Sequence, residues 1–421
     1  MDEERTLILG MDLCDGALQL AYLDDRGEMI SVSPFTNDAG KYRIPMIVCT
    51  DRQYKEWYCG QDARNMKGRE GIVYCDDLIE RAKDDDGEPV LGGLTPTALF
   101  TQFFRIVLTS LREKTGGRMI KGLTVCIKKE DEAAQPVIRA AFSQLGIDSD
   151  RLLIITHPES FVNYVISQNK DIWINDVGLF YMSMDALDYY RLTFGRKQSP
   201  ICVVTEKTNL SSLVTGRMIA NGDITNAVVG FKDAISKVLT KQMVSALYFT
   251  GPGFESAWAD DILKSLCNGR RIFRGQNLFV KGAGFKSRRQ FSPGEDEEDF
   301  VYIAPDELKS SISLRAYKDG GYEEAVLADI STPYTKAGKD VEVIMDETNE
   351  LDLIVHNVLK KDFVCAIMTL DNLEERNDRS VKVRITLQFV DRDTCMITVR
   401  DVGFGEIRET SYRIWEQILK I

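Results

Sequence analysis

The sequence has few of the residues that build metal sites and nucleophilic centres. Its 421 residues include only two histidines, His157 and His356, and no two cysteines have the two-residue spacing of common zinc motifs. Zinc sites of that kind and catalytic triads built on histidine therefore have little material to draw on. We expect neither chemistry in this chain.

Long apolar runs and an excess of basic residues are also missing. No run approaches the roughly 18 to 20 apolar residues that a membrane helix needs, and the polar start Met1–Arg5 leads directly into a strand-like segment. With 53 basic and 65 acidic residues the formal net charge is −12, which disfavours the clustered cations of a nucleic-acid surface. We expect a cytoplasmic protein that binds neither membranes nor nucleic acids.

The nine cysteines are an odd number, and most of them lie inside apolar runs. A thiol in such surroundings behaves as a small apolar side chain. We therefore expect reduced, structural cysteines, among them Cys126, Cys202, Cys365 and Cys395.

Strand and helix patterns alternate over the first 285 residues. The buried run Thr6–Gly16 ends in a polar turn and Ala17–Leu23 follows it, so this pair predicts a β-hairpin with acid and glycine at its tip. Tyr42–Val48 predicts another strand, and Gly60–Asn65 predicts the start of a helix.

A β-α-β pattern comes next. Thr95 and Pro96 supply a helix N-cap and first position, after which apolar residues recur at helical spacing. The patterns farther along predict strands over 123–127, 152–155, 177–182, 188–194 and 244–249, and helices over 137–145 and 226–243.

Several segments resemble, in order, the nucleotide-binding domain of the seventy-kilodalton heat-shock chaperones, a branch of the actin-like ATPase superfamily. Gly10–Gly16 lies where that family has its first phosphate loop, and Gly122–Ile166 is similar to its connecting region. Phe249–Phe254 resembles the adenosine loop, and Asn277–Gly284 resembles the helix that closes the domain. The order and spacing of these matches are more specific than any one of them.

This resemblance implies an α/β actin-like (ribonuclease-H-like) two-lobed ATPase fold with a reduced second lobe, followed by a C-terminal antiparallel β-domain similar to a β-sandwich. We place the first domain at residues 1–290, with a peripheral insertion at about 45–115 and the second lobe from about 177. The polar, acidic stretch 291–303 is expected to be a linker, and 304–421 a β-rich module like the chaperones' substrate domain. Within it, alternating apolar residues over 381–399 predict a long antiparallel hairpin.

The resemblance also assigns site residues. Asp12 matches the first-loop aspartate and Glu159 the connecting-region glutamate, which implies that both are vestigial catalytic residues that would hold Mg²⁺ through water. Without the resemblance, Asp12 would cap a turn and Glu159 would favour a helix N-terminus. The residues implied to contact a nucleotide are Gly10, Asp12, Leu13, Cys14, Asp185, Gly251, Pro252 and Gly253.

The second phosphate loop departs from the family pattern. In Phe180–Leu187 its glycines are gone, so side chains occupy the space that phosphates would need. Met182 lies about where the catalytic aspartate is expected, and Asp185 could replace that aspartate only in a rebuilt turn.

Two more parts of the hydrolytic apparatus are missing. The segment Ile72–Ile79, which matches the position of the catalytic lysine, offers Asp76 and Asp77 instead. The stretch from Met182 to Phe249 is also too short for the family's adenine-clamping subdomain. Phosphoanhydride hydrolysis needs a cation for the developing charge and a cradle for the phosphates.

These losses favour a chaperone-like pseudo-ATPase that serves as a protein-binding scaffold with little or no ATP hydrolysis. No cofactor is certain; Mg-ATP or ADP belongs to the alternative, a divergent but active ATP-dependent chaperone in which Asp12, Glu159 and Asp185 organise magnesium. A sugar or acetate kinase of the same superfamily lacks a substrate-site signature. We expect a protein or peptide partner, and Leu351–Val355 and Val364–Met368 either line a peptide groove or belong to the core.

Overall fold

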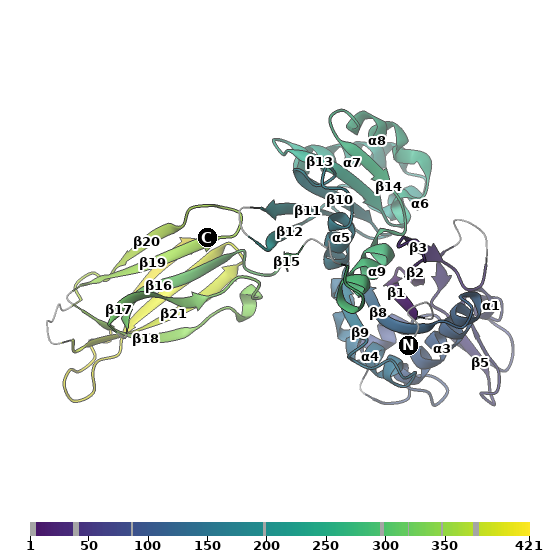
Figure 1. The fold of residues 1–421 in the computed structure, drawn as a ribbon, viewed down its shortest axis with the longest axis horizontal. Coiled ribbons are helices and arrows are strands. Elements are labelled where there is room, and N and C mark those ends of the chain that lie inside the picture. The colour runs from purple at the N-terminus through teal and green to yellow at the C-terminus, as the bar shows by residue number, and fades with distance from the viewer. Residues whose placement is uncertain are drawn as a thin grey trace. The chain divides into compact units, whose positions relative to one another are not determined.

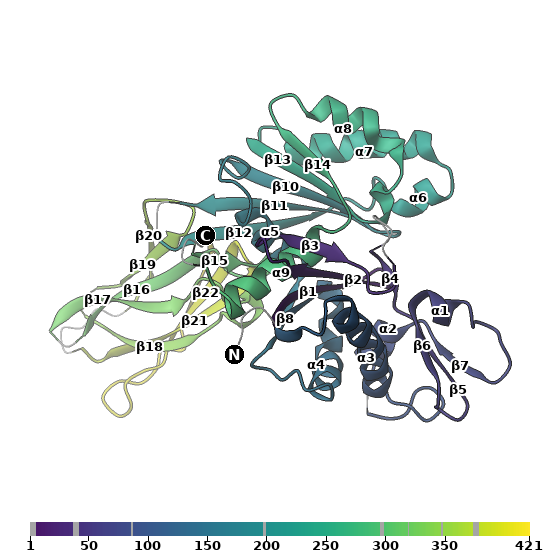
Figure 2. The same cartoon turned by 45° about the vertical axis from the view of Figure 1, so that its right-hand side comes forward.

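The computed structural model describes residues 6–36, 42–85, 87–196, 199–294, 299–318, 320–346, 348–373 and 379–421. Contacts within the chain divide it into two units (Figures 1 and 2). The first unit comprises Met1–Tyr190 with Thr208–Glu298, and the second comprises Arg191–Lys207 with Asp299–Ile421. Among the described helices, none combines the length and apolar character that crossing a bilayer requires.

The first unit is built around a mixed sheet with β1 (Thr6–Cys14) at its centre. β1 pairs antiparallel with β2 (Ala17–Leu23) and parallel with β8 (Met119–Ile127). The strand order is β3-β2-β1-β8-β9, with β4 beside β2. All residues of β1 except its two end residues are buried, as expected for a strand covered on both faces. The remaining strands are β3 (Met29–Val32), β4 (Ile44–Pro45) and β9 (Leu152–Thr156).

Helices cover both faces of this sheet. α3 (Pro96–Lys114) and α4 (Gln135–Ser143) share an apolar core with Leu9, Met11 and Leu13 of β1. Because side chains alternate along a strand, Gly10 and Asp12 face the other side. There α9 (Leu278–Phe291) packs against β1 and β8, beside α5 (His157–Ile166). The predicted helix at Thr95 is confirmed, since its hydroxyl accepts a hydrogen bond from the N–H of Ala98.

Gly10 is required for the close approach of α9 to β1. A Cβ at this position would lie 2.5 Å from the backbone oxygen of Val280 and would also collide with the backbone of Gly284. Only glycine leaves room for a helix backbone at such a distance. This packing fixes the place of α9 above the end of β1.

A second sheet of the first unit contains β10, β13 and β14. β10 (Asp176–Met182) pairs parallel with β13 (Val244–Thr250), and β13 pairs parallel with β14 (Arg271–Arg274). α7 (Ile224–Leu239) and α8 (Asp260–Leu266) share the core on one face of these strands. On the opposite face Phe161 and Tyr164 of α5 contact Tyr248 edge to face. Thus α5 and α9 lie between the two sheets (Figure 2).

A small three-stranded sheet, of order β6-β5-β7, lies in the segment between β4 and β8. The single strand that the sequence predicts over 42–48 is wrong, because this segment holds β4 of the first sheet and only the first residue of β5. Pro45 is the last partner of β2, and the N–H of Ile47 bonds back to the Pro45 carbonyl, so the chain turns out of the first sheet there. The elements are β5 (Val48–Asp51), β6 (Trp57–Cys59), β7 (Ile72–Cys75), α1 (Gly60–Arg64) and α2 (Leu78–Lys83).

The second unit contains two four-stranded antiparallel sheets, of order β17-β16-β19-β20 and β18-β21-β22-β23. One apolar core contains residues of both sheets. The predicted C-terminal hairpin is confirmed: Val383, Ile385 and Leu387 point inward and are paired across to the next strand. The strands are β16 (Ser310–Lys318), β17 (Gly321–Ala328), β18 (Asp340–Met345), β19 (Glu350–Asn357), β20 (Val364–Thr369), β21 (Val381–Asp391), β22 (Thr394–Asp401) and β23 (Ile414–Lys420).

A further strand pair belongs to the second unit although its two strands are far apart in the chain. β12 (Ile201–Asn209) pairs parallel with β15 (Phe300–Ile303), and Cys202, Val204 and Ile303 share a small apolar cluster. The unit boundary runs through β11 (Leu187–Gly195) and β12. The sequence assigns residues 191–207 to the first domain and 291–303 to a linker. Residues 295–298 of that linker lie outside the described residues, whereas residues 300–303 form β15.

Candidate functional site

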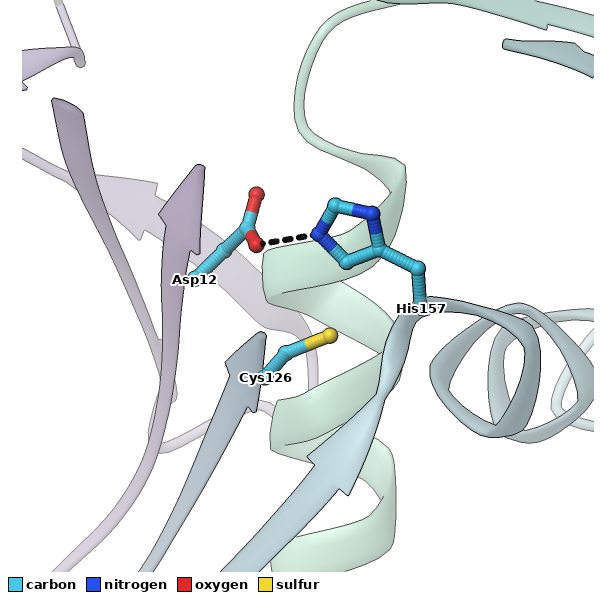
Figure 3. A group of neighbouring side chains, drawn as sticks. All are labelled: Asp12, Cys126 and His157. Carbon is cyan, nitrogen blue, oxygen red and sulfur yellow. Dashed lines mark hydrogen bonds and ion pairs between the residues drawn. The ribbon is translucent and has the colours of Figure 1, made fainter. Parts of the chain in front are cut away.

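Asp12, Cys126 and His157, here called the Asp12 cluster, meet at the ends of three elements of the first unit (Figure 3). Asp12 and Cys126 are register partners on β1 and β8, and His157 is the first residue of α5. Their exposed fractions are 2%, 0% and 3%. The Nε2 atom of His157 lies 2.9 Å from Oδ1 of Asp12, and one ligand atom from each residue lies within 4.8 Å of the others.

The imidazole of His157 is held in place by aromatic neighbours. It stacks on Phe279 of α9, with ring centroids 3.9 Å apart and an angle of 7° between the planes. The ring of Tyr181 meets it edge to face, with ring centroids 5.6 Å apart. The Ser160 hydroxyl donates to the carbonyl of Phe279 at 2.6 Å, which ties α5 to α9. The ring therefore presents Nε2 to Asp12 in a fixed orientation.

The Cys126 thiol is neutral in these surroundings. Burial raises its pKa well above the ordinary value, and the negative charge of Asp12 raises it further. A thiol of this kind is a poor nucleophile. We therefore do not assign Cys126 to covalent catalysis.

A second polar group, here called the Asp15 network, lies at the tip of the β1–β2 hairpin. Lys128 Nζ is 2.5 Å from one carboxylate oxygen of Asp15, and the Tyr181 hydroxyl donates to the other at 2.7 Å. The Cys14 thiol lies 3.0 Å from the Tyr181 oxygen. Burial by itself would raise the pKa of Asp15, but the charge and hydrogen bond of Lys128 and the hydrogen bond of Tyr181 outweigh it, so this pKa lies below the usual value.

The backbone groups assigned to a nucleotide are already engaged by side chains. The Gly251 N–H donates to Oε1 of Gln276 at 3.1 Å, and the Gly251 carbonyl accepts from Nε2 of the same residue at 3.0 Å. The Gly253 carbonyl accepts from Nε1 of Trp258 at 2.7 Å. Met182 packs so closely on Gly253 that a Cβ there would collide with its side chain. These backbone groups are therefore bound within the protein, and Met182 fills the space beside Gly253.

Several other predicted site residues have partners outside the Asp12 cluster, although the charge of Glu159 still acts on Cys126. The Glu159 carboxylate pairs with Lys286 of α9 at 2.9 Å. Asp185 pairs with Arg217, and 70% of its side chain is exposed. Leu13 belongs to the core beneath α3. Of the predicted residues, Asp12 and Cys14 share one face of β1, while Glu159 and Asp185 do not join them.

The aspartates found in place of the expected lysine have cationic partners of their own. Asp76 pairs with Lys67 at 2.9 Å, and Asp77 pairs with Arg81 at 2.6 Å. A lysine does stand beside the hairpin tip, but it is Lys128, directly after β8. Its ammonium is bound to Asp15 in this arrangement.

Several residues that make the site were missed in the sequence: Cys126, Lys128, His157, Tyr181 and Gln276. The exclusion of zinc chemistry rested on donors close in sequence, yet His157 and Asp12 are 145 positions apart. Two signals were available, because His157 is one of two histidines and both it and Cys126 lie at the ends of buried strands. The expectation for cysteines is confirmed for Cys126 and wrong for Cys365, which is exposed.

An open groove of about 900 Å³ lies in the first unit, and Gln276 is part of its lining. Arg43 and Glu255 face each other in it at 3.5 Å. Gln276 and Asn277 line it as well, so the loop that holds Gly251 borders the groove. The groove lining carries both signs of charge and also contains apolar side chains, among them Phe35 and Ile44.

Comparison with known families shows which family the chain belongs to. Residues 28–305 match the family of unknown function DUF5716, C-terminal region. The chain belongs to this family. Residues 307–421 match the domain of unknown function DUF8552. No curated protein matches the chain.

The DUF5716 match covers two of the three residues of the Asp12 cluster. It begins at residue 28, after the β1–β2 hairpin, and so includes Cys126 and His157 but not Asp12. The two matches meet just after β15, where the C-terminal sheets begin. The DUF8552 part therefore contains both four-stranded antiparallel sheets.

Proposed function

We propose that the chain is a degenerate relative of the seventy-kilodalton heat-shock chaperones, and that its first unit has an actin-like, ribonuclease-H-like fold. The support is an arrangement of strands that occurs twice in the first unit. Hairpin β1–β2 is followed by the parallel strands β8 and β9, and the neighbours β10 and β11 are followed by the parallel strand β13. α5 and α9 lie between the two halves, where the closing helix of that fold is expected.

We infer that the protein is a pseudo-ATPase that acts as a protein-binding scaffold. One observation carries this proposal: Gln276 binds both the N–H and the carbonyl of Gly251, so a side chain of the protein occupies the hydrogen bonds of the implied adenosine loop. Binding a nucleotide would have to break these bonds and move Met182 off Gly253. Displacing satisfied groups costs affinity for any ligand that cannot restore every bond.

Isothermal titration of Mg-ATP and Mg-ADP into the full chain tests the proposal. We expect no heat of binding up to millimolar nucleotide and no phosphate release above background, with a cooperative melt as the check on folding. Micromolar, magnesium-dependent binding with turnover would overturn the scaffold proposal.

The alternative, a divergent ATPase, makes a different prediction for two aspartates. Turnover would then fall in Asp12→Asn, because Asp12 would hold the metal-bound water. Asp171→Asn is a matched comparison, because its exposed carboxylate pairs with Arg271 and is not among the residues that would organise magnesium. Turnover lost in the first variant and kept in the second would place catalysis at Asp12.

A groove of about 850 Å³ in the second unit is the proposed site for an extended peptide. It runs beside the exposed pair Tyr317 and Tyr322, whose rings meet edge to face at 5.4 Å, and the guanidinium of Arg315 lies over Tyr322. Exposed tyrosine and arginine side chains are typical of binding surfaces. Of the two predicted segments, the first belongs to the core through Leu351, Leu353 and Val355, and Leu351 also lines the groove. In the second, Met368 belongs to the core and none of its residues lines this groove.

Selection of random heptapeptides on the full chain tests this groove. Peptides that bind wild-type protein should bind Tyr317→Ala/Tyr322→Ala at least about tenfold more weakly, since hot-spot aromatics contribute 2 kcal/mol or more, roughly. Tyr412→Ala is the control, because Tyr412 is 84% exposed and is not part of the groove. Equal binding by the double variant and wild type would remove the groove from the proposal.

A further inference from the structure

The Asp12 cluster has the composition of a transition-metal site. A carboxylate oxygen, a thiol sulfur and an imidazole nitrogen lie within 4.8 Å of one another. Zinc–nitrogen and zinc–sulfur bonds are about 2.0 and 2.3 Å long, so two such donors in a tetrahedral site lie roughly 3.5 Å apart. Small side-chain rotations would bring all three donors to one ion. We propose that Asp12, Cys126 and His157 bind a divalent transition-metal ion directly, with zinc as the expected metal.

The donor types decide which metal fits. Magnesium takes oxygen ligands and keeps several of its waters, so sulfur and imidazole donors do not suit it. A thiolate and an imidazole together are typical ligands of zinc and of cobalt, its usual spectroscopic substitute. The proposed ion therefore differs, in element and in mode of binding, from a magnesium held through water by carboxylates.

The protein holds the three donors ready for an ion. Parallel register places Asp12 and Cys126 side by side on one face of the sheet. The stacking of His157 on Phe279 fixes the direction of Nε2. Metal sites gain affinity when neighbouring groups orient their ligands in this way.

Metal binding and the present hydrogen bond exclude each other. Nε2 of His157 and Oδ1 of Asp12 face each other as the two atoms of the 2.9 Å hydrogen bond. An ion bound to both would take the place of the shared proton and open this contact, and the neutral Cys126 thiol would release its proton to become the thiolate ligand. Three protein ligands leave a fourth position for water or a small molecule, as in zinc sites that act chemically. Cys14 lies on the same face of β1, but its sulfur contacts Tyr181.

Cobalt titration of the full chain tests the proposal without any variant. Protein stripped with a chelator should bind one Co²⁺ per chain and develop the near-ultraviolet charge-transfer absorption of a cobalt–thiolate bond. Zinc should abolish this absorption by displacement. This readout does not depend on nucleotide binding, so failure of the metal site and failure of the pseudo-ATPase proposal are distinguishable.

The chain offers matched controls for both ligand types. Cys126→Ser and His157→Gln should weaken cobalt binding by more than the roughly 10- to 100-fold that changes around a metal's ligands cost. His356→Gln, at the other histidine, and Cys202→Ser, at a buried thiol of the second unit, should leave it unchanged.

Three results would overturn the metal site. They are the absence of stoichiometric cobalt binding, binding without the thiolate absorption, and absorption that persists in Cys126→Ser. If both ligand variants fail to fold, the wild-type cobalt spectrum and its displacement by zinc decide between the proposal and its rejection.

Discussion

Asp12 in the first unit and Asp401 in the second are both buried aspartates, yet their partners differ. The two carboxylate oxygens of Asp401 accept hydrogen bonds from Arg408 at 2.6 and 2.7 Å and further bonds from Ser411 and the Gly403 N–H. Asp12 instead faces an imidazole and a thiol. The carboxylate of Asp401 already has a fixed cationic partner, so its role is structural. The carboxylate of Asp12 lies beside two side chains of metal-binding types, and these three groups together can bind an added cation.

We expect the largest loss of stability when Asp401 is replaced. Asp401→Ala would leave the guanidinium of Arg408 buried without this carboxylate, and breaking a buried pair costs about 3 to 5 kcal/mol of unfolding free energy. Urea unfolding should show the loss through Trp415 fluorescence, with the other three tryptophans replaced by phenylalanine. The exposed pair Glu342 and Arg384 is the control, since Glu342→Ala removes a solvent-screened ion pair and should change the stability far less.

Acid should produce the next effect in the second unit. Burial tends to raise the pKa of Asp401, but the hydrogen bonds from Arg408 and Ser411 outweigh it and hold this pKa below the usual range. A lowered folded pKa contributes stability that is present above the unfolded value, about 3.9, and is lost as pH falls through the folded value. The effect is smaller than that of Asp401→Ala because a protonated carboxyl still fills its place.

Urea midpoints for the second unit, measured with the same Trp415 probe at neutral pH and near pH 3, check the acid effect. Wild-type protein should lose stability between these values, and Asp401→Asn should lose less. An equal loss in both proteins would show that other carboxylates control the acid sensitivity.

His157→Phe should have a moderate effect on the first unit. Phenylalanine can keep the stacking on Phe279 but leaves the buried Asp12 without its donor, at a cost of about 1 to 3 kcal/mol. Adding Asp12→Asn removes the buried charge and should recover part of the loss. Urea unfolding of the single and double variants measures this coupling. A loss as large as that of Asp401→Ala would contradict the contrast between the two aspartates.

Tyr181→Phe should cost less, about 1 kcal/mol, because Lys128 still pairs with Asp15 when the hydroxyl is gone. The matched control is Tyr22→Phe, at a half-buried tyrosine for which no hydroxyl hydrogen bond occurs among the described residues. Thermal melts of both variants compare them directly. An equal decrease in the two would mean that the Asp15 network contributes nothing at this hydroxyl.

Asp185→Ala should have the smallest effect, within about 0.5 kcal/mol, because its pair with Arg217 is exposed to solvent. It should also leave cobalt binding unchanged. A clear loss of stability or of metal would bring Asp185 into the site and favour a rebuilt loop around it.

Local patterns in the sequence predict much of the fold. The β1–β2 hairpin, the helix capped by Thr95 and the β21–β22 hairpin follow from alternation, capping and turn residues within short windows. The pairing of β12 with β15 leaves no such signal, because parallel pairing joins segments that are far apart in the chain. The prediction of one strand over 42–48 is wrong because this segment contributes to two different sheets, and the local pattern does not show the break between them.

The candidate site could be predicted only in part. Asp12 is predicted because it matches the first-loop aspartate of the chaperone family that the sequence resembles. Cys126 lies beside Asp12 because β8 pairs with β1 in that register. To place His157 there, the packing of α5 against α9 must also be known. The amide of Gln276 bonds to both backbone groups of Gly251, which lies 25 positions earlier, and such a contact has no signature in a local sequence pattern.

The division of the second unit between two stretches of chain has a consequence for biosynthesis. A ribosome releases residues 191–207 well before residues 299–421, so β12 emerges long before its partner β15 exists. Until then the edge of β12 is a place where a chaperone or a neighbouring nascent chain can pair. A fragment that starts at residue 299 would lack β12 altogether, and Ile303 would lose its apolar neighbours Cys202 and Val204.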